Sequence, residues 1–416
     1  MKSWSDVYLP PIDGKYFFPQ LALCNSVTSQ NQLLPIKEQY RIYVCGITPY
    51  DATHLGHAAT YLVFDLVNRY LRAMGKIVHY VQNVTDIDDP LLERANRDGI
   101  DWEDLAQSQV DLFRGDMSDL HVIPPESYIG AVEAIPLVLA AIEDLSAREA
   151  IYKVDEDLYF SVHADPEFGS RSQLARDEMI EIFSSRGGDP GREGKRDPLD
   201  ALVWLRQRPH EPGWPSPFGQ GRPGWHIECC AIALTYLPTP VADSADPFVI
   251  DIQGGGSDLL FPHHEMGASQ AALITGKEFA RLYMHTGMIG LNGEKMSKSL
   301  GNLVFLSELV KSGVDPMAIR IALLSDHYAK DRMWNDSLLT QGIEFLDRLR
   351  LLLSRPEVAP TSEVIQNLIF ALSNNLDTVG AFEILRSWCV ETENGEIGGH
   401  AGELSRAIDL LLGIAI

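Results

Sequence analysis

The chain has 416 residues, of which 45% are hydrophobic and 22% are charged, ordinary proportions for a globular protein. It has 34 Lys and Arg residues and 58 Asp and Glu residues, which gives a formal net charge of −24. Because contacts to phosphate supply most of the affinity of proteins for nucleic acids, so acidic a chain is a poor candidate for wrapping a polyanion. The length exceeds what one hydrophobic core usually supports, so we expect two or three packed units.

The cysteine content and the N-terminus indicate where the protein works. The chain has five cysteines without regular spacing, a pattern that does not fit a disulfide framework. The N-terminal residues lack an apolar core of signal-peptide length. No run reaches the roughly 20 apolar residues of a membrane span. We therefore expect a cytoplasmic protein with no membrane partner.

The first regular elements form a strand followed by a helix. LALCNSVTSQNQLLPI (21–36) predicts a hairpin, and RIYVCG (41–46) is typical of a buried strand that ends at Cys45 and Gly46. Helical periodicity starts near Leu55, so the helix N-terminus offers its free N–H groups to an anion. His54 and His57 lie three residues apart and share one face of the first turn. Alone, this stretch fits a Rossmann-like unit with two surface histidines equally well.

A second buried strand, VHYVQNVTDIDDP (78–90), runs into an acidic segment before Pro90. We interpret Asp86, Asp88 and Asp89 as N-terminal caps of the following helix and not as metal ligands. The strand–helix–strand order predicts a right-handed crossover and a parallel sheet. Residues 101–122 and 131–149 are expected to be amphipathic helices, and 151–223, rich in Gly, Pro and charges, to be an insertion.

The sheet is expected to resume at PFVIDI (247–252), which leads into three glycines, Gly254 to Gly256. Three glycines without side chains let a nucleotide lie close to the backbone, and Asp258 would then be placed to bind a ribose hydroxyl or an amine. The alternative is that the glycines only form a tight loop. RLYMHTGMIG then leads into GEKMSKSLGN (293–302), where Lys295 and Lys298 suit the charge that develops on a leaving pyrophosphate. Taken alone, this could be a solvated basic loop. From about Leu306 the pattern predicts a helical bundle.

Three separated elements carry candidate metal ligands. Cys45 ends the first strand, Cys229 and Cys230 follow GRPGWHIE, and His263 and His264 lie in FPHHE. Zinc prefers thiolate and imidazole, and a catalytic zinc keeps three protein ligands and one open position. Spacing alone does not distinguish such a site from buried inert thiols and ordinary histidines, because the chain has no CxxC or HxxxH pair among these residues.

Several motifs together resemble a known family. HLGH and KMSKS resemble the signatures of class I aminoacyl-tRNA synthetases. The ordered set YVCG, HLGH, KRDPLDALVWL, GRPGWHIEC, GGGSDLLFPHHE and KMSKSLGN resembles cysteinyl-tRNA synthetases over residues 20 to about 330. The resemblance implies a Rossmann nucleotide-binding core with an inserted α/β segment and a C-terminal helical bundle. We expect the first half of the core with its hairpin in 1–122, the insert in 123–224, the second half in 225–305 and the bundle in 306–416.

The chain departs from these synthetases in two ways. Their FPHHENE ends in a Glu that completes the zinc shell, whereas this register holds Gly267. They also carry an anticodon-reading region after the bundle, and this chain ends first. With PYDATHLGHA, DIQGGG and SRGGDP (185–190), it resembles the cysteine ligases of mycothiol biosynthesis, which join L-cysteine to the amine of glucosaminyl-inositol. The expected partners are therefore the small molecules L-cysteine, ATP and glucosaminyl-inositol, and no tRNA. The protein itself is expected to be a monomer.

Three other functions remain open at this point. A truncated cysteinyl-tRNA synthetase would share the activation step but need tRNA. A non-catalytic nucleotide-binding relative would not need both HLGH and KMSKS, and a zinc hydrolase built on FPHHE would leave the lysine loop unused.

The resemblance also implies roles for individual residues. Zinc would be bound by Cys45, Cys229 and His263, and would take the substrate thiol directly. His54 and His57 would hold the phosphates, while Lys295 and Lys298, with Mg²⁺, would stabilise the departing pyrophosphate. Thr48 and Thr85 are expected near the amine and carboxyl groups of cysteine, and Trp225 as a flat apolar wall. The full expected cysteinyl-adenylate pocket comprises Cys45, Gly46, Ile47, Thr48, Thr60, Asn83, Val84, Thr85, Trp225, Gly256, Ser257, Asp258 and Ile289.

Overall fold

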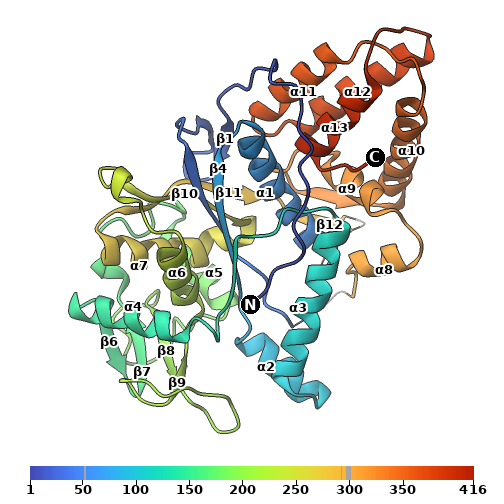
Figure 1. Cartoon of the computed structure of the whole chain (residues 1–416). Helices are drawn as coiled ribbons and strands as arrows, with labels where there is room; N and C mark the ends of the chain where they lie inside the picture. Colours follow the sequence, from blue (N-terminus) through green and yellow to red (C-terminus); the bar gives the residue numbers. More distant parts are fainter. Residues whose placement is uncertain (51–52, 292, 297–300) are drawn as a thin grey trace.

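The computed structural model describes residues 1–50, 53–291, 293–296 and 301–416 (Figure 1). Its centre is a sheet of five parallel strands in the order β11-β10-β3-β4-β5. These strands are β3 (Gln39–Val44), β4 (Ile77–Val84), β5 (Ser127–Gly130), β10 (Phe248–Gly256) and β11 (Glu278–Thr286). The parallel sheet expected from the strand–helix–strand order is confirmed. Strand β3 pairs with β10 on one side and β4 on the other, so the strand order reverses between β3 and β10, where open α/β sheets bind ligands.

The alternation of side chains along β3 divides the interior into two cores. Tyr40, Ile42 and Val44 point into a core shared with α1 (Leu55–Ala73), whereas Tyr43 and Cys45 point into the opposite one. The second core is formed with α4 (Ile135–Ala147), α6 (Trp225–Tyr236) and α7 (Glu265–Thr275), which cover that face of the sheet (Figure 1). The period of two residues thus already determines that Cys45 faces α6 and α7.

The predicted N-terminal hairpin is present as β1 (Ala22–Asn25) and β2 (Gln30–Leu33). Its turn is held against the core sheet, because the Ser26 amide donates to the Tyr283 carbonyl of β11 at 2.8 Å. After β4 come α2 (Asp89–Asp98) and α3 (Trp102–Asp119). Asp88 caps α2 by accepting from the Asp89 amide, as expected, but Asp86 does not cap this helix and accepts from the Val132 amide at 2.9 Å.

The insertion forms a separate antiparallel sheet in the order β6-β7-β8-β9. Its elements are β6 (Ile151–Val154), β7 (Asp157–Phe160), η1 (Val162–Ala164), α5 (Arg176–Ser185), β8 (Ala201–Arg206) and β9 (Gly221–Pro223). Strand β5 lies within the expected insert 123–224 but pairs with β4 in the core sheet. We therefore propose that the insert begins after Gly130, because sheet pairing places the preceding strand in the core.

Beyond β11 a small sheet in the order β13-β12-β14 leads into the predicted helical region. Its strands are β12 (Ile289–Leu291), β13 (Glu294–Lys295) and β14 (Arg332–Trp334). The helices are α8 (Leu306–Lys311), α9 (Pro316–Leu324), α10 (Asp336–Leu353), α11 (Ser362–Ser373), α12 (Thr378–Glu393) and α13 (Ala401–Leu412). Helices α9 to α13 contribute to the core that also holds α1 (Figure 1). None of the helices in the described ranges is long and apolar enough to cross a membrane.

Candidate active and metal site

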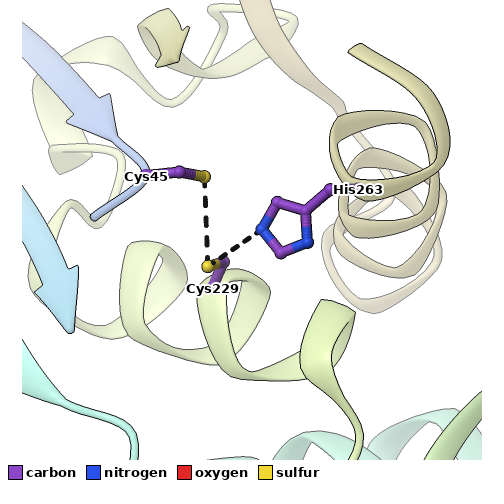
Figure 2. Close-up of side chains that lie close together, drawn as sticks. All are labelled: Cys45, Cys229 and His263. Carbon is purple, nitrogen blue, oxygen red and sulfur yellow. Dashed lines mark hydrogen bonds between the residues drawn. The ribbon is translucent and has the colours of Figure 1, made fainter. Parts of the chain in front are cut away.

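Three soft ligands meet at the carboxyl edge of the core sheet. Cys45 comes directly after β3, Cys229 lies in α6, and His263 lies in the irregular turn η4 (Leu260–His264) that leads into α7 (Figure 2). The Sγ atoms of Cys45 and Cys229 are 3.9 Å apart, and His263 Nε2 is 3.1 Å from Cys229 Sγ. All three ligand atoms lie within 4.8 Å of one another, and each residue is at most 6% exposed. The three residues expected to bind zinc are therefore together.

The charges of this cluster fit a divalent metal with soft ligands. Burial alone would raise the pKa of the Cys229 thiol, but the hydrogen bond from Cys45 and the charge of His263 lower it well below its usual value. Burial and the neighbouring Cys229 raise the pKa of Cys45. Without a metal ion the Cys45 thiol donates to the Cys229 sulfur, and a bound metal ion would take the place of that proton. Two thiolates and an imidazole are a ligand set that zinc prefers, and three protein ligands leave a fourth position open.

Cys230, the other candidate thiol, does not belong to the cluster. It is 1% exposed and packs in the core on the α6 side of the sheet. Burial and the charge of Cys229 raise its pKa, so its thiol stays protonated. Adjacent positions on a helix point about 100° apart, which is why only one of the two cysteines reaches Cys45.

The imidazole of His263 is held by two residues of the WHIEC motif. Its Nδ1 lies 3.1 Å from Nδ1 of His226, so one proton is shared between these nitrogens. The ring of Trp225 stacks on that of His263, with centroids 4.3 Å apart. Trp225 therefore lies flat against the candidate metal ligand, and its expected role as a wall of the adenylate pocket stays a prediction. The role of His226 was missed in the sequence, although its position three residues before Cys229 was visible there.

Gly267 lines a small cavity together with Cys45, Cys229 and His263. A Cβ atom built on Gly267 would have the His226 carbonyl oxygen, at 3.8 Å, as its nearest neighbour, which is an ordinary contact. A side chain could therefore start at this position on α7 and reach towards the three ligands.

Gly267→Glu should leave metal binding intact but weaken cysteine binding, because a carboxylate would compete for the open position. We expect a loss of about tenfold in cysteine affinity. Metal content by emission spectroscopy and cysteine affinity by titration calorimetry would check this. Gly267→Ala is the control, since a methyl group fits the space without offering a ligand. Unchanged cysteine affinity in the glutamate variant would contradict the prediction.

Residues of the expected adenylate pocket lie where β3 and β4 end. The Gly46 amide donates to Asn83 Oδ1 at 2.8 Å, and the Thr85 amide donates to the Ile47 carbonyl at 2.9 Å. A Cβ atom on Gly46 would lie 1.6 Å from the Asn83 carbonyl oxygen, so only glycine fits. These bonds lock the two strand ends together, with Thr48 just beyond the first and Val84 just before Thr85 on the second.

The glycine-rich end of β10 lies beside the same edge. A Cβ atom on Gly254 would lie 2.3 Å from the Phe64 ring on α1, so glycine allows the close approach of strand and helix. Strand β10 ends at Gly256, and Ser257 and Asp258 form the short helix η3 (Ser257–Leu259). Thr60 of α1 hydrogen-bonds Thr286 at the end of β11, with the hydroxyl oxygens 2.9 Å apart. Ile289 opens β12 shortly after this point.

The SRGGDP segment of the insert reaches the same loop. Arg186 donates to the carbonyl oxygens of Asp258 in η3 and Phe261 in η4, shortly before His263. The remaining short helix, η2 (Val241–Asp243), lies between α6 and β10. The insert thus holds the loop that carries both the expected ribose ligand and the third metal ligand.

The two histidines of HLGH lie at the N-terminus of α1, as predicted. His54 caps this helix, with Nδ1 accepting from the Gly56 amide at 3.0 Å, and its ring lies 4.0 Å from that of His57. The Leu55 amide donates to the Val304 carbonyl at 3.0 Å, so the chain just after KMSKS pairs with HLGH. Lys295 lies in β13, whereas Lys298 is outside the described residues. The segment that follows the lysine loop therefore meets HLGH at Val304, and the catalytic roles stay predictions.

Comparisons with known proteins agree with this geometry. Residues 32–344 match the family model described as the tRNA synthetases class I (C) catalytic domain. A protein of Kribbella flavida named L-cysteine:1D-myo-inositol 2-amino-2-deoxy-alpha-D-glucopyranoside ligase is 55% identical, with 100% of both chains covered. A protein of the same name from Thermomonospora curvata is 52% identical, again with 100% of both chains covered.

Two solved structures share the fold at low sequence identity. Mycobacterium tuberculosis methionyl-tRNA synthetase with methionyl-adenylate has a TM-score of 0.61 at 16% identity, covering 91% of this chain and 90% of that one. The LeuRS of Agrobacterium radiobacter K84, in its ternary complex with tRNA and LeuAMS, has a TM-score of 0.62 at 12% identity, covering 98% and 85%. The expected class I synthetase fold is confirmed. By its catalytic-domain match and its full-length identity, this chain belongs to the L-cysteine:1D-myo-inositol 2-amino-2-deoxy-alpha-D-glucopyranoside ligase family of class I synthetases.

Proposed function

We propose that this chain ligates L-cysteine to the amine of glucosaminyl-inositol, using ATP and a cysteinyl-adenylate, as a step of mycothiol biosynthesis. The observation that carries the proposal is the buried cluster of Cys45, Cys229 and His263 at the edge where this fold binds nucleotides. Such a ligand set suits a substrate that brings a thiol of its own. The proposed acceptor, glucosaminyl-inositol, comes from the names of relatives that are 55% and 52% identical to this chain over its full length.

The metal site would select the amino acid. Cys45, Cys229 and His263 would hold a zinc ion, which when bound supplies a soft Lewis acid for the thiolate of the substrate. A hydroxyl is a much poorer partner for such an ion, so serine would be rejected. Thr48 and Thr85, near the locked ends of β3 and β4, would orient the amine and carboxyl groups of cysteine.

In the first step the cysteine carboxylate attacks the α-phosphorus of ATP. A carboxylate oxygen–phosphorus bond forms, and the bond from phosphorus to the bridging oxygen breaks, so that pyrophosphate leaves. His54, His57 and the N-terminus of α1 would hold the phosphates. Lys295 and Lys298 would balance the charge that develops on the leaving group, with Mg²⁺ bound to the nucleotide.

In the second step the neutral amine of the sugar attacks the activated carbonyl carbon. A carbon–nitrogen bond forms, the bond from this carbon to the AMP oxygen breaks, and the amine loses a proton. The remaining members of the pocket, Trp225, Gly256, Ser257, Asp258 and Ile289 among them, would hold the adenylate during this exchange. We further propose that the enzyme works in the cytoplasm, because all five cysteines are free thiols, which is usual for proteins of a reducing compartment. A monomer is what the family resemblance implies, and we propose it on that ground alone.

An assay that offers either acceptor distinguishes this function from that of a truncated cysteinyl-tRNA synthetase. With cysteine and ATP alone, pyrophosphate should exchange into ATP, and serine should give no exchange. Adding glucosaminyl-inositol should release AMP and form the ligated product, whereas adding tRNA should not. Consumption of tRNA would favour the alternative, and absence of exchange in metal-loaded protein would contradict the adenylate mechanism altogether.

A further inference from the structure

A line of short polar contacts runs from the N-terminal hairpin into the metal cluster. His264 Nε2 lies 3.2 Å from Cys45 Sγ, and His264 Nδ1 lies 2.8 Å from Nε2 of His285 on β11. His285 Nδ1 lies 2.8 Å from the hydroxyl oxygen of Ser26, in the turn between β1 and β2. Both imidazoles are buried, with 3% and 8% of their surfaces exposed. The function described above uses neither His285 nor Ser26.

The chemistry of Cys45 fixes the direction of every hydrogen bond in this line. A cysteine that binds a metal is a thiolate, and its sulfur can only accept. The facing nitrogen of His264 must then carry a hydrogen, and a neutral imidazole has only one, so His264 Nδ1 accepts. By the same reasoning His285 donates through Nε2 and accepts through Nδ1. The Ser26 hydroxyl must therefore be the donor at the far end.

We infer that Ser26, His285 and His264 form a positioning chain that sets the tautomer of His264 and orients the Cys45 thiolate for metal binding. The inference rests on the proposed metal site and names residues that determine its affinity. Gln253 Nε2 donates to the same sulfur at 3.4 Å, so a Cys45 thiolate would have two donors, His264 and Gln253. Donors of this kind orient a ligand and moderate the charge that it gives to the metal.

Because Ser26 lies at the far end of this positioning chain, a substitution there tests the chain without changing any candidate metal ligand. Ser26 is held by its own amide, which bonds the Tyr283 carbonyl, so removing the hydroxyl should leave the turn in place. If the histidines only filled the core, the loss of this hydroxyl would not affect the metal. If they form a chain, the loss removes the group that fixes the tautomer of both rings.

The test measures the zinc affinity of the full-length protein by competition with a coloured chelator. Ser26→Ala should bind zinc about tenfold more weakly, the lower end of what outer-shell partners contribute. Ser26→Thr keeps the hydroxyl and should stay within about twofold of the unmodified protein. Thr28 lies in the same turn but outside this hydrogen-bonded line, and its hydroxyl donates to the Asn25 carbonyl at 3.5 Å, so Thr28→Ala should also leave zinc affinity unchanged.

A spectroscopic readout distinguishes loss of the positioning chain from a general destabilisation of the fold as the cause of weaker zinc binding. In cobalt-loaded protein, Ser26→Ala should shift the thiolate-to-cobalt charge-transfer band to lower energy, because a thiolate that loses a donor gives up charge more easily. Equal zinc affinity in Ser26→Ala and the unmodified protein would overturn the inference alone, with cysteine activation still standing. Failure of the unmodified protein to bind zinc would overturn both the inference and the proposed metal site.

Discussion

Cys229→Ser should lose the metal and, with it, cysteine activation. Cys229 is the central ligand, because both Cys45 Sγ and His263 Nε2 contact its sulfur. A serine hydroxyl is not ionised at neutral pH and is a poor zinc ligand, so only one thiolate and one imidazole would remain. We expect metal content to fall below about a tenth of an equivalent per chain, since structural and catalytic zinc sites need at least three protein ligands. Emission spectroscopy of dialysed protein and cysteine-dependent pyrophosphate exchange would measure both effects.

The neighbouring thiol provides the matched control. Cys230→Ser makes the same chemical change one residue later, at a buried side chain that is not part of the cluster. It should keep its metal and its exchange activity, apart from a small loss of stability. Metal loss in the Cys230 variant, with retention in the Cys229 variant, would show that the other thiolate binds the metal.

Asp65→Asn should destabilise the protein more than any substitution on its surface. Asp65 of α1 is buried between two buried guanidinium groups, those of Arg69, at 2.7 Å, and of Arg320 on α9. Its other oxygen accepts from the Ile123 amide at 2.8 Å, a bond that asparagine can keep. Removing the charge leaves these two buried cations with only Asp409 nearby, a partly exposed carboxylate 3.7 Å from Arg69, and breaking a buried pair typically costs about 3–5 kcal/mol. The shift of the urea unfolding midpoint would report this loss.

An exposed pair of the same residue types is the control. Arg114 and Asp111 on α3 form an ion pair at 2.7 Å, but the Asp111 side chain is 58% exposed. Asp111→Asn should change the free energy of unfolding by less than about 1 kcal/mol, as is usual for surface pairs. Equal effects of the two substitutions would contradict the role of the buried charge.

The stability contributed by Asp65 should also depend on pH in a defined direction. Burial alone would raise the pKa of Asp65, but the charges of Arg69 and Arg320 lower it below its usual value. Burial lowers the pKa of Arg320 to about 10, so this group remains charged at neutral pH. Because the folded pKa of Asp65 is the lower one, its contribution is complete above the unfolded value of about 3.9. It is lost as the pH falls through the folded pKa, and Asp65→Asn should lack this part of the acid transition.

Local patterns in the sequence were sufficient to predict the elements around the site. Alternation along RIYVCG predicts the buried strand β3, and the periodicity after His54 predicts α1 with both histidines at its first turn. The order of strands and helices predicts a parallel sheet, whose carboxyl edge carries the site. These features depend on residues close together in the chain, where backbone geometry alone relates position to direction.

The contacts between distant elements were decided by the tertiary structure. Cys45 and Cys229 are 184 positions apart, and which of two adjacent cysteines reaches Cys45 depends on the rotation of α6 as it packs on the sheet. His285 and Ser26 carry no signal in the sequence, because they meet His264 only when β11 pairs with β10 and the hairpin closes over it. Asp65 meets Arg320 across 255 residues only when α9 packs against α1. Periodicity specifies which face of an element is buried, but the partner of that face is selected by the packing of the whole chain.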